Sequence, residues 1–460
     1  MWRQYIMVLR FGSSFSKNVH NSIFNLPPTH ISLPKLIEIG NQLRIDNDSS
    51  VLSELAISEI AVQREFDQKE SGDDEFFSSR RCYIIDSIKN NEELELFRLV
   101  YSTLFYSIGV FSNLDIREKN LEKKGLSKSE IYQLIDRDSG EEIKSGQKVS
   151  DTFVHSDIFI RIDESTSTVI NNKISRCLNL IFGSEIITPS TNETAMYQAF
   201  AAAGNSACLS RQVGASITNS KGEIISVGWN DVPKFNGGVY AYDELDPLSK
   251  KDFRCINKDG GVCFNDLEKE LIRSLLLDKL IEEKIIEEAN REKAEKIIKG
   301  SRLKDLIEFS RAVHAEMHAI IIGSQKAGQD VINGKLFCTT YPCHNCARHI
   351  VAAGIKEVYY IEPYRKSLAL KLHNDSITED ENDSNKLRIL MFDGVSPRRY
   401  LDFFKMLPNS RKESNGKKKK YDRKTIAPKT TISLQAIPIL EKEVIKELKN
   451  KHLINVGDES

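Results

Sequence analysis

The chain has 460 residues, too many for one ordinary hydrophobic core, and at about 150 residues per domain it predicts two to three domains. A hydrophobic content of 40% with 28% charged residues is typical of a globular protein, and the net charge of −1 disfavours a general attraction to nucleic acid. Eight cysteines do not make a dense disulfide framework, which favours a reducing cytoplasm. No apolar run of 18 residues occurs and residues 1–10 do not resemble a signal peptide, so no membrane span is expected.

The first 183 residues are expected to form an α/β domain with a parallel sheet. Apolar runs that predict strands alternate with stretches that predict helices, an order typical of parallel sheets. The runs are residues 4–9, 81–87, 104–111 and 157–162, and the helical stretches are 32–62, 92–98 and 127–136. Asp86 follows its strand where such sheets place functional groups, although an aspartate that caps a helix is the alternative.

A glycine- and serine-rich turn follows the first predicted strand. A strand, such a loop with a lysine, and a helix would be the layout of a phosphate-binding loop. The spacing from Gly12 to Lys17 is one residue short, and the second glycine and the following Ser or Thr are absent. A plain strand and turn is therefore the favoured interpretation of residues 11–17.

A three-layer α/β/α domain is expected over residues 187–405. Residues 187–193 are typical of a linker that ends in a helix N-cap. The elements that follow are a helix at 191–203, a hairpin of 212–218 and 224–229, a helix from 314, a strand at 335–338, a helix from 343 and a strand at 357–361. This order places the starts of the last two helices on the same side of one sheet.

An insertion at about 235–300 interrupts that order. Its second part, 267–299, is predicted to be one charged helix with an apolar stripe of Leu271, Leu275, Ile281 and Ile285. We expect the stripe to pack on the same chain or on a partner subunit, and the protein to form a homo-oligomer. A second, structural zinc ion that uses some of Cys255, Cys263 and His318 is an alternative. The spacing of the two cysteines does not favour it, because it is not a typical ligand pattern.

Residues 406–460 are predicted to be a basic linker and a C-terminal helix. The run of lysines from Lys417 to Lys420 is typical of a solvated linker, and contact with nucleic acid is the alternative. The helix is expected over 440–453 and could dock on the body of the protein.

The most specific motif pairs His314-x-Glu316 with Pro342-Cys343-x-x-Cys346 about thirty residues later. One imidazole and two thiolates fill three corners of a tetrahedron and leave the fourth for water, as a catalytic zinc site requires. Both halves are predicted to open helices, and a helix N-terminus favours the thiolate form of cysteine. The motif predicts that His314, Cys343 and Cys346 bind Zn²⁺.

Glu316 is not a zinc ligand in this interpretation. Its carboxylate would take a proton from the attacking water, pass it to a ring nitrogen and help an amino group leave as ammonia. A structural zinc knuckle or a redox pair is the alternative for Cys343 and Cys346 alone. The joint pattern favours a zinc-dependent hydrolytic deaminase.

Residues 187 to 405 resemble the deoxycytidylate deaminase branch of the cytidine-deaminase-like superfamily. Beyond the zinc motif, the similar segments are 211–215, 228–233 and 352–358. With its long N-terminal part and the segments 361–367 and 394–400, nearly the whole chain looks like the bacterial anti-phage dCTP deaminases. The resemblance implies a P-loop kinase-like regulatory domain over 1–183, and an activity that converts dCTP to dUTP and so depletes a DNA precursor of the phage. The phosphate loop is degenerate here, a departure from that pattern.

The resemblance also implies that Asn230 contacts the sugar of the nucleotide. A triphosphate requires several cationic donors, and the candidates are Arg211, Arg348, Arg365 and Lys366, each of which could equally be a surface charge. The alternatives are a dCMP deaminase of pyrimidine metabolism, a deaminase of RNA or single-stranded DNA, and a sensor without catalysis. The near-zero net charge disfavours a polynucleotide substrate, and the intact Glu316 disfavours a sensor.

Overall fold

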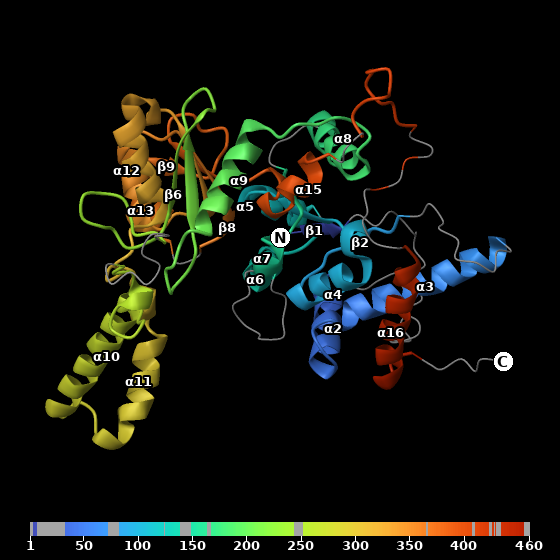
Figure 1. Ribbon diagram of the computed structural model, residues 1–460. Coiled ribbons are helices and arrows are strands. Elements are labelled where there is room, and N and C mark those ends of the chain that lie inside the picture. Colours follow the sequence, from blue (N-terminus) through green and yellow to red (C-terminus); the bar gives the residue numbers. More distant parts are fainter. Residues whose placement is uncertain are drawn as a thin grey trace. The chain divides into compact units, whose positions relative to one another are not determined.

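The computed structural model divides the chain into two compact units (Figure 1). Unit 1 comprises Met1–Thr188 and Phe392–Ser460, and unit 2 comprises Pro189–Met391. The structure describes residues 3–6, 33–71, 82–123, 125–138, 149–162, 167–242, 252–364, 367–406, 410–422, 426, 428 and 434–454. No helix within these ranges is long and apolar enough to cross a membrane.

Unit 1 contains a mixed sheet of five strands in the order β11-β4-β3-β1-β2. The strands are β1 (Arg3–Ile6), β2 (Ile85–Asp86), β3 (Ser107–Phe111), β4 (Ile158–Arg161) and β11 (Gly394–Val395). Only β3 and β4 pair in parallel, whereas β1 is antiparallel to β2 and β3, and β11 is antiparallel to β4. The expected parallel sheet is therefore wrong for most of its pairs, since a short apolar run reads the same in either strand direction.

Nine helices are described in unit 1. They are α2 (Leu33–Asp46), α3 (Val51–Ser71), α4 (Asn91–Tyr101), α5 (Leu114–Glu122), α6 (Lys128–Asp138), α7 (Val149–Phe153), α8 (Ser167–Phe182), α15 (Tyr400–Phe404) and α16 (Ile437–Asn450). The single helix expected over 32–62 is two helices, because Asp48 Oδ1 accepts hydrogen bonds from the Ser50 backbone N–H at 2.9 Å and from its hydroxyl at 2.8 Å. This turn separates α2 from α3. The glycine- and serine-rich stretch 11–17 lies outside the described residues.

The segments after residue 391 complete unit 1 rather than the deaminase-like domain, which was expected to extend to 405. Phe392 is 1% exposed and packs edge-on against Phe159 of β4, with ring centroids 6.2 Å apart. Two residues later β11 pairs with β4. Helix α16 buries Ile437 and Val444 in a core that includes residues of α3 and α4, so the expected docking of the C-terminal helix is confirmed within unit 1.

Unit 2 contains a six-stranded sheet in the order β6-β5-β7-β8-β10-β9. Its strands are β5 (Gly214–Thr218), β6 (Ile224–Trp229), β7 (Lys335–Thr340), β8 (Glu357–Glu362), β9 (Ile377–Thr378) and β10 (Leu387–Met391). β5 is antiparallel to β6 and β7, and β7, β8, β10 and β9 are parallel to one another. The helices are α9 (Thr191–Ala203), α10 (Phe264–Glu282), α11 (Arg291–Gly300), α12 (Ala315–Ala327), α13 (His344–Ala352) and α14 (Ala369–Leu372). The predicted hairpin of β5 and β6 is confirmed.

Helices cover both faces of this sheet, as expected for an α/β/α domain. A Cβ atom on Gly214 of β5 would lie 1.9 Å from the Ala199 carbonyl oxygen of α9, and one on Gly228 of β6 would lie 2.4 Å from the Ala319 nitrogen of α12. Gly228 pairs with Ala215, the residue next to Gly214, so the two glycines point to opposite faces. Figure 1 shows α9 on one side of the strands and α12 and α13 on the other.

The insertion, expected to end at about residue 300, runs to Arg311 in the structure, and it forms a helical hairpin, not the single helix expected over 267–299. Helix α10 ends at Glu282, Lys284 takes a positive φ of 56°, and the chain reverses into α11 (yellow in Figure 1). No glycine or proline marks this reversal, which explains why the sequence pattern missed it. Within the described part of the chain, Leu271 remains 50% exposed and Leu275 59% exposed. The described residues therefore leave most of the stripe exposed, and the homo-oligomer stays a prediction.

Candidate zinc and catalytic site

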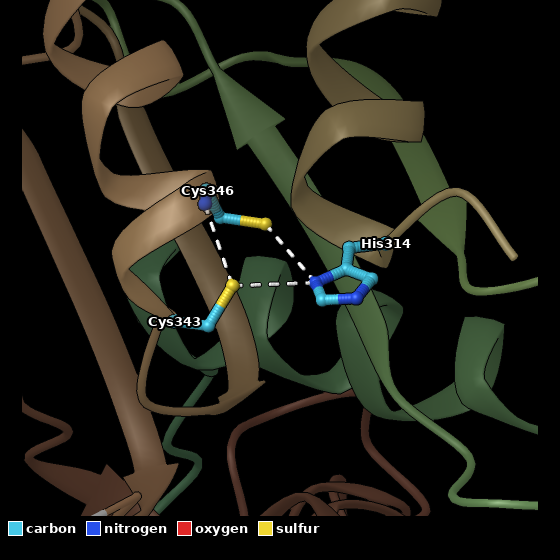
Figure 2. A group of neighbouring side chains, drawn as sticks. All are labelled: His314, Cys343 and Cys346. Atoms are coloured by element: carbon cyan, nitrogen blue, oxygen red, sulfur yellow. Dashed lines mark hydrogen bonds between the residues drawn. The ribbon is translucent and has the colours of Figure 1, made fainter. Parts of the chain in front are cut away.

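Two helix starts in unit 2 carry the motif residues. His314 is the N-cap of α12, and Glu316 lies in the first turn of that helix. Cys343 is the N-cap of α13, where its Sγ accepts a hydrogen bond from the backbone N–H of Cys346 at 3.4 Å. Because α12 and α13 lie on the same face of the sheet, the two helix starts bring the three side chains together. Figure 2 shows them pointing toward one common point.

The separations of these side chains fit a zinc ion. His314 Nδ1 lies 3.4 Å from the Sγ atoms of both Cys343 and Cys346. Ligands at about 2.0 Å (N) and 2.3 Å (S) on tetrahedral corners would stand roughly 3.5 Å apart, close to the observed value. Within the described ranges this is the one group of three possible ligands whose binding atoms all lie within 4.8 Å of one another. Zinc is the cofactor that this donor set favours.

The side chains of the group shift one another's pKa values. Hydrogen bonds from Cys346 and His314 lower the pKa of the Cys343 thiol to about 4, and the same interaction raises the pKa of Cys346. The hydrogen bond with Cys343 raises the pKa of His314 to about 9. The neighbours thus favour one thiolate, that of Cys343, while His314 and Cys346 would release their protons when a metal binds.

Glu316 is the buried carboxyl group of the site. The residue is 4% exposed, and burial, with the nearby charge of Cys343, raises its pKa to about 7. A carboxyl group with a pKa near the working pH can both accept and donate a proton, which is what a general acid–base requires. Its position beside the zinc ligands is the one that the motif predicted.

A pocket with a cavity volume of about 430 Å³ opens onto these residues. His314, Glu316 and Cys343 line one part of it, together with Tyr341 and Tyr364. This volume is within the range of small-molecule sites. The arrangement can hold a planar heterocycle against a metal and a buried proton carrier.

Two of the five candidate substrate residues line the pocket. Asn230 is 7% exposed, and its side chain accepts from Val213 N–H at 2.7 Å and donates to the Arg211 carbonyl at 2.7 Å. This amide therefore holds the loop before β5 in place. The Arg211 side chain is 52% exposed, with its Nη1 4.0 Å from Glu362 Oε2.

The other candidates are not assembled at the pocket. Arg348 is exposed on α13 and is absent from the pocket lining, while Arg365 and Lys366 lie outside the described residues. His318, considered for a second zinc site, accepts a hydrogen bond at Nδ1 from the backbone N–H of Trp229 at 3.2 Å. Its ring also packs edge-on against the Trp229 indole. Cys255 and Cys263 line the pocket instead, next to Cys208.

Sequence reasoning missed the wall that the insertion contributes. Phe264, Lys269, Lys304, Leu306 and Ile307 all line the pocket, although they precede the zinc motif in the chain. No motif connects them with His314, because their position depends on how the insertion folds back. Tyr341 could have been found, since it stands two residues before Cys343.

Comparisons with known proteins agree with this site. Residues 189–362 match the family described as the cytidine and deoxycytidylate deaminase zinc-binding region. ComE operon protein 2 of Bacillus subtilis strain 168 is 45% identical over 56 residues, which are 12% of this chain and 29% of that protein. Deoxycytidylate deaminase of Enterobacteria phage T4 is 27% identical over 174 residues, 38% of this chain and 79% of the phage enzyme.

A solved dCMP deaminase from cyanophage S-TIM5, in complex with dCMP and dUMP, aligns over 45% of this chain and 99% of its own at 19% identity, with a TM-score of 0.26. The chain thus spans less than a third of the Bacillus protein and about four fifths of the T4 enzyme. The family match and the zinc-ligand group both fall within residues 189–362. This region is therefore similar to the zinc-binding region of cytidine and deoxycytidylate deaminases, and its ligand group agrees with zinc as the cofactor.

Proposed function

We propose that unit 2 hydrolyses a free cytosine deoxynucleotide, with dCTP converted to dUTP and ammonia. The observation that carries the proposal is the position of Glu316, a carboxyl group 4% exposed in the first turn of α12, beside the His314, Cys343 and Cys346 group. A binding protein would have no need for such a proton carrier. A hydrolytic deaminase needs one at this place.

Each residue has a defined task in this reaction. His314, Cys343 and Cys346 hold zinc, which when bound makes water a nucleophile near neutral pH. Glu316 accepts a proton from the attacking water and delivers it to the N3 atom of the cytosine ring while the water oxygen bonds to C4. Glu316 then carries the second proton to the amino group, the C4–N bond breaks, and ammonia leaves as the C4 carbonyl forms. The 4% exposure of Glu316 limits the access of bulk water to its carboxyl group.

The choice of dCTP rests on the resemblance to anti-phage dCTP deaminases. Depletion of dCTP would then deprive an infecting phage of a DNA precursor. The second candidate is a dCMP deaminase, because the phage T4 relative carries the name deoxycytidylate deaminase and the S-TIM5 enzyme binds dCMP. Asn230 and Arg211 line the pocket, and we assign the sugar to the first and a phosphate to the second.

The test is to incubate the full-length protein with dCTP, dCMP, CTP and a cytosine-containing oligonucleotide and to measure ammonia. Release from dCTP at the highest kcat/KM is the expected result. A preference for dCMP would support the second candidate. Release from the oligonucleotide alone would overturn both and would identify a polynucleotide deaminase.

A further inference from the structure

The insertion forms part of the deaminase pocket. Phe264 at the start of α10, and Leu306 and Ile307 in the segment that leads back to the zinc motif, line the same cavity as His314 and Glu316. The Asn265 side-chain amide donates to the Leu306 carbonyl at 3.1 Å and so ties these two segments together. A wall of the active-site pocket is thus supplied by chain that lies outside the α/β/α layers.

Contacts at both ends of the insertion hold this wall in place. Near its beginning, Arg254 is 8% exposed and lies between Asp252 at 2.7 Å and Asp231 at 3.9 Å. Asp231 is 1% exposed and follows β6 directly after Asn230. Near its end, Arg311 lies 5.1 Å from the ring centroid of Phe264 and donates to the Phe253 carbonyl at 3.1 Å. Because ion pairs and a cation–π contact anchor it, the wall can position charged groups toward a ligand.

Basic side chains from two separate segments of the chain line this pocket. Arg211 comes from the loop before β5, and Lys269 and Lys304 come from the insertion. Asp266 engages Lys269 at 2.9 Å, and Arg211 lies 4.0 Å from its nearest carboxylate, that of Glu362. Lys304, in the short 3₁₀ helix Arg302–Asp305, has an exposed side chain with no hydrogen bond or ion pair among the described residues. Its ammonium group is available for a ligand anion.

We infer that the insertion binds the phosphate end of the nucleotide, with Lys304 as the residue that determines phosphate specificity and Arg211 as a second cation of the same pocket. A cytosine ring held at Glu316 leaves the sugar and phosphates to extend toward the pocket walls. A phosphate chain presents several negative oxygens, and a lysine ammonium binds them as a point charge. This inference rests on the proposed function, since it concerns the same pocket and a free nucleotide.

The experiment compares kcat/KM for dCTP, dCMP and deoxycytidine in the full-length wild-type protein and in Lys304→Ala. Loss of one charge-assisted hydrogen bond should lower kcat/KM for dCTP by about tenfold to a hundredfold, mainly through a higher KM. The effect on dCMP should be smaller, and deoxycytidine should change less than about twofold, because it has no phosphate. Lys304→Arg should retain most of the activity on dCTP.

Lys299→Ala is the matched control, because Lys299 is an exposed lysine of α11 in the same insertion that does not line the pocket. Dissociation constants of dCTP and deoxycytidine for the Glu316→Gln protein, with and without Lys304→Ala, separate binding from turnover. An active wild type whose preference for dCTP over deoxycytidine is unchanged in Lys304→Ala would overturn the inference alone. A wild type that releases no ammonia from any free nucleotide would overturn the proposed function and this inference with it.

Discussion

The two units bury carboxyl groups beside different partners: arginines in unit 1, and cysteine and histidine in unit 2. In unit 1, Glu93 lies 2.7 Å from Arg44, and Glu441 accepts hydrogen bonds from Arg64 at 2.9 Å and from the Tyr101 hydroxyl at 2.9 Å. Burial raises the pKa of Glu93 and of Glu441, and the arginines oppose that rise.

In unit 2, Glu316 is equally buried, but no arginine or lysine in the described ranges forms an ion pair with it. Burial and the charge of Cys343 raise its pKa to about 7. A buried carboxyl group that forms an ion pair with arginine helps to hold the fold together, because its charge is compensated. A carboxyl group left beside cysteine and histidine keeps an exchangeable proton, and it is the one that can do chemistry.

The largest effect is expected from the loss of zinc. Treatment with a chelator should abolish ammonia release, and added Zn²⁺, but not Mg²⁺, should restore it, because imidazole and thiolates select zinc. Cys346→Ala should lower the zinc content measured by atomic emission. Cys177→Ala, a buried cysteine of unit 1, is the control that should keep it. Full turnover by a protein without zinc would contradict the assignment of the three ligands.

The next effect concerns the proton carrier. Glu316→Gln should reduce kcat by about a hundredfold to ten-thousandfold, because the amide has nearly the same shape but transfers no proton. Zinc content should stay unchanged, since Glu316 is not a ligand. Turnover at the wild-type rate would show that the buried carboxyl group of unit 2 is structural like those of unit 1.

Substitution of a carboxyl group of unit 1 that pairs with arginine should lower the stability of the fold instead of the activity. Glu441→Ala leaves Arg64 and the Tyr101 hydroxyl without their acceptor, and breaking a buried pair of this kind costs about 3 kcal/mol. Hydrogen-exchange protection of α16 should fall accordingly, while zinc content is retained. Glu443→Ala is the control, because Glu443 lies on the same helix, 69% exposed and 3.9 Å from Lys446, where a pair contributes about 0.5 kcal/mol. Equal losses of stability in Glu441→Ala and Glu443→Ala would contradict the stabilising role of the buried Glu441.

The smallest effect is expected on the pKa of one histidine of unit 1, His155. Burial, and then the charges of Arg398 and Arg98, lower the pKa of His155, whose Nδ1 lies 2.6 Å from Arg398 Nη1. Arg398→Ala should raise that pKa toward its ordinary value, and Arg398→Lys should keep it low. An imidazole titration by NMR measures the shift.

The lowered pKa of His155 also determines how the stability of unit 1 depends on pH. A histidine whose folded pKa lies below the unfolded value of about 6.5 contributes stability that is lost as the pH falls through that range. Arg398→Ala should make the loss between pH 7 and the lowered pKa smaller. An unchanged pKa of His155 in Arg398→Ala would mean that burial and Arg98 set it without Arg398.

The parts of the molecule that could be predicted are those with local causes. Two of the predicted zinc ligands, His314 and Cys343, are helix N-caps, and a capping box of Ser190 and Glu193 opens α9, so short segments of sequence were sufficient. The parts that could not be predicted depend on distant partners. Glu441 and Arg64 are 377 residues apart, and nothing near either residue indicates their pairing. The reversal at Lys284 and the pocket position of Lys304 likewise depend on how the insertion packs.

The division of the chain also sets an order of assembly during synthesis. The ribosome synthesises Met391, and with it the last strand of the six-stranded sheet, before it makes β11 and α16. Domains fold as units once their residues have emerged. The catalytic part can therefore reach its final structure while the flanking unit still waits for its last helix, so any influence that the flanking unit exerts on a newborn chain begins only after the enzyme itself is complete.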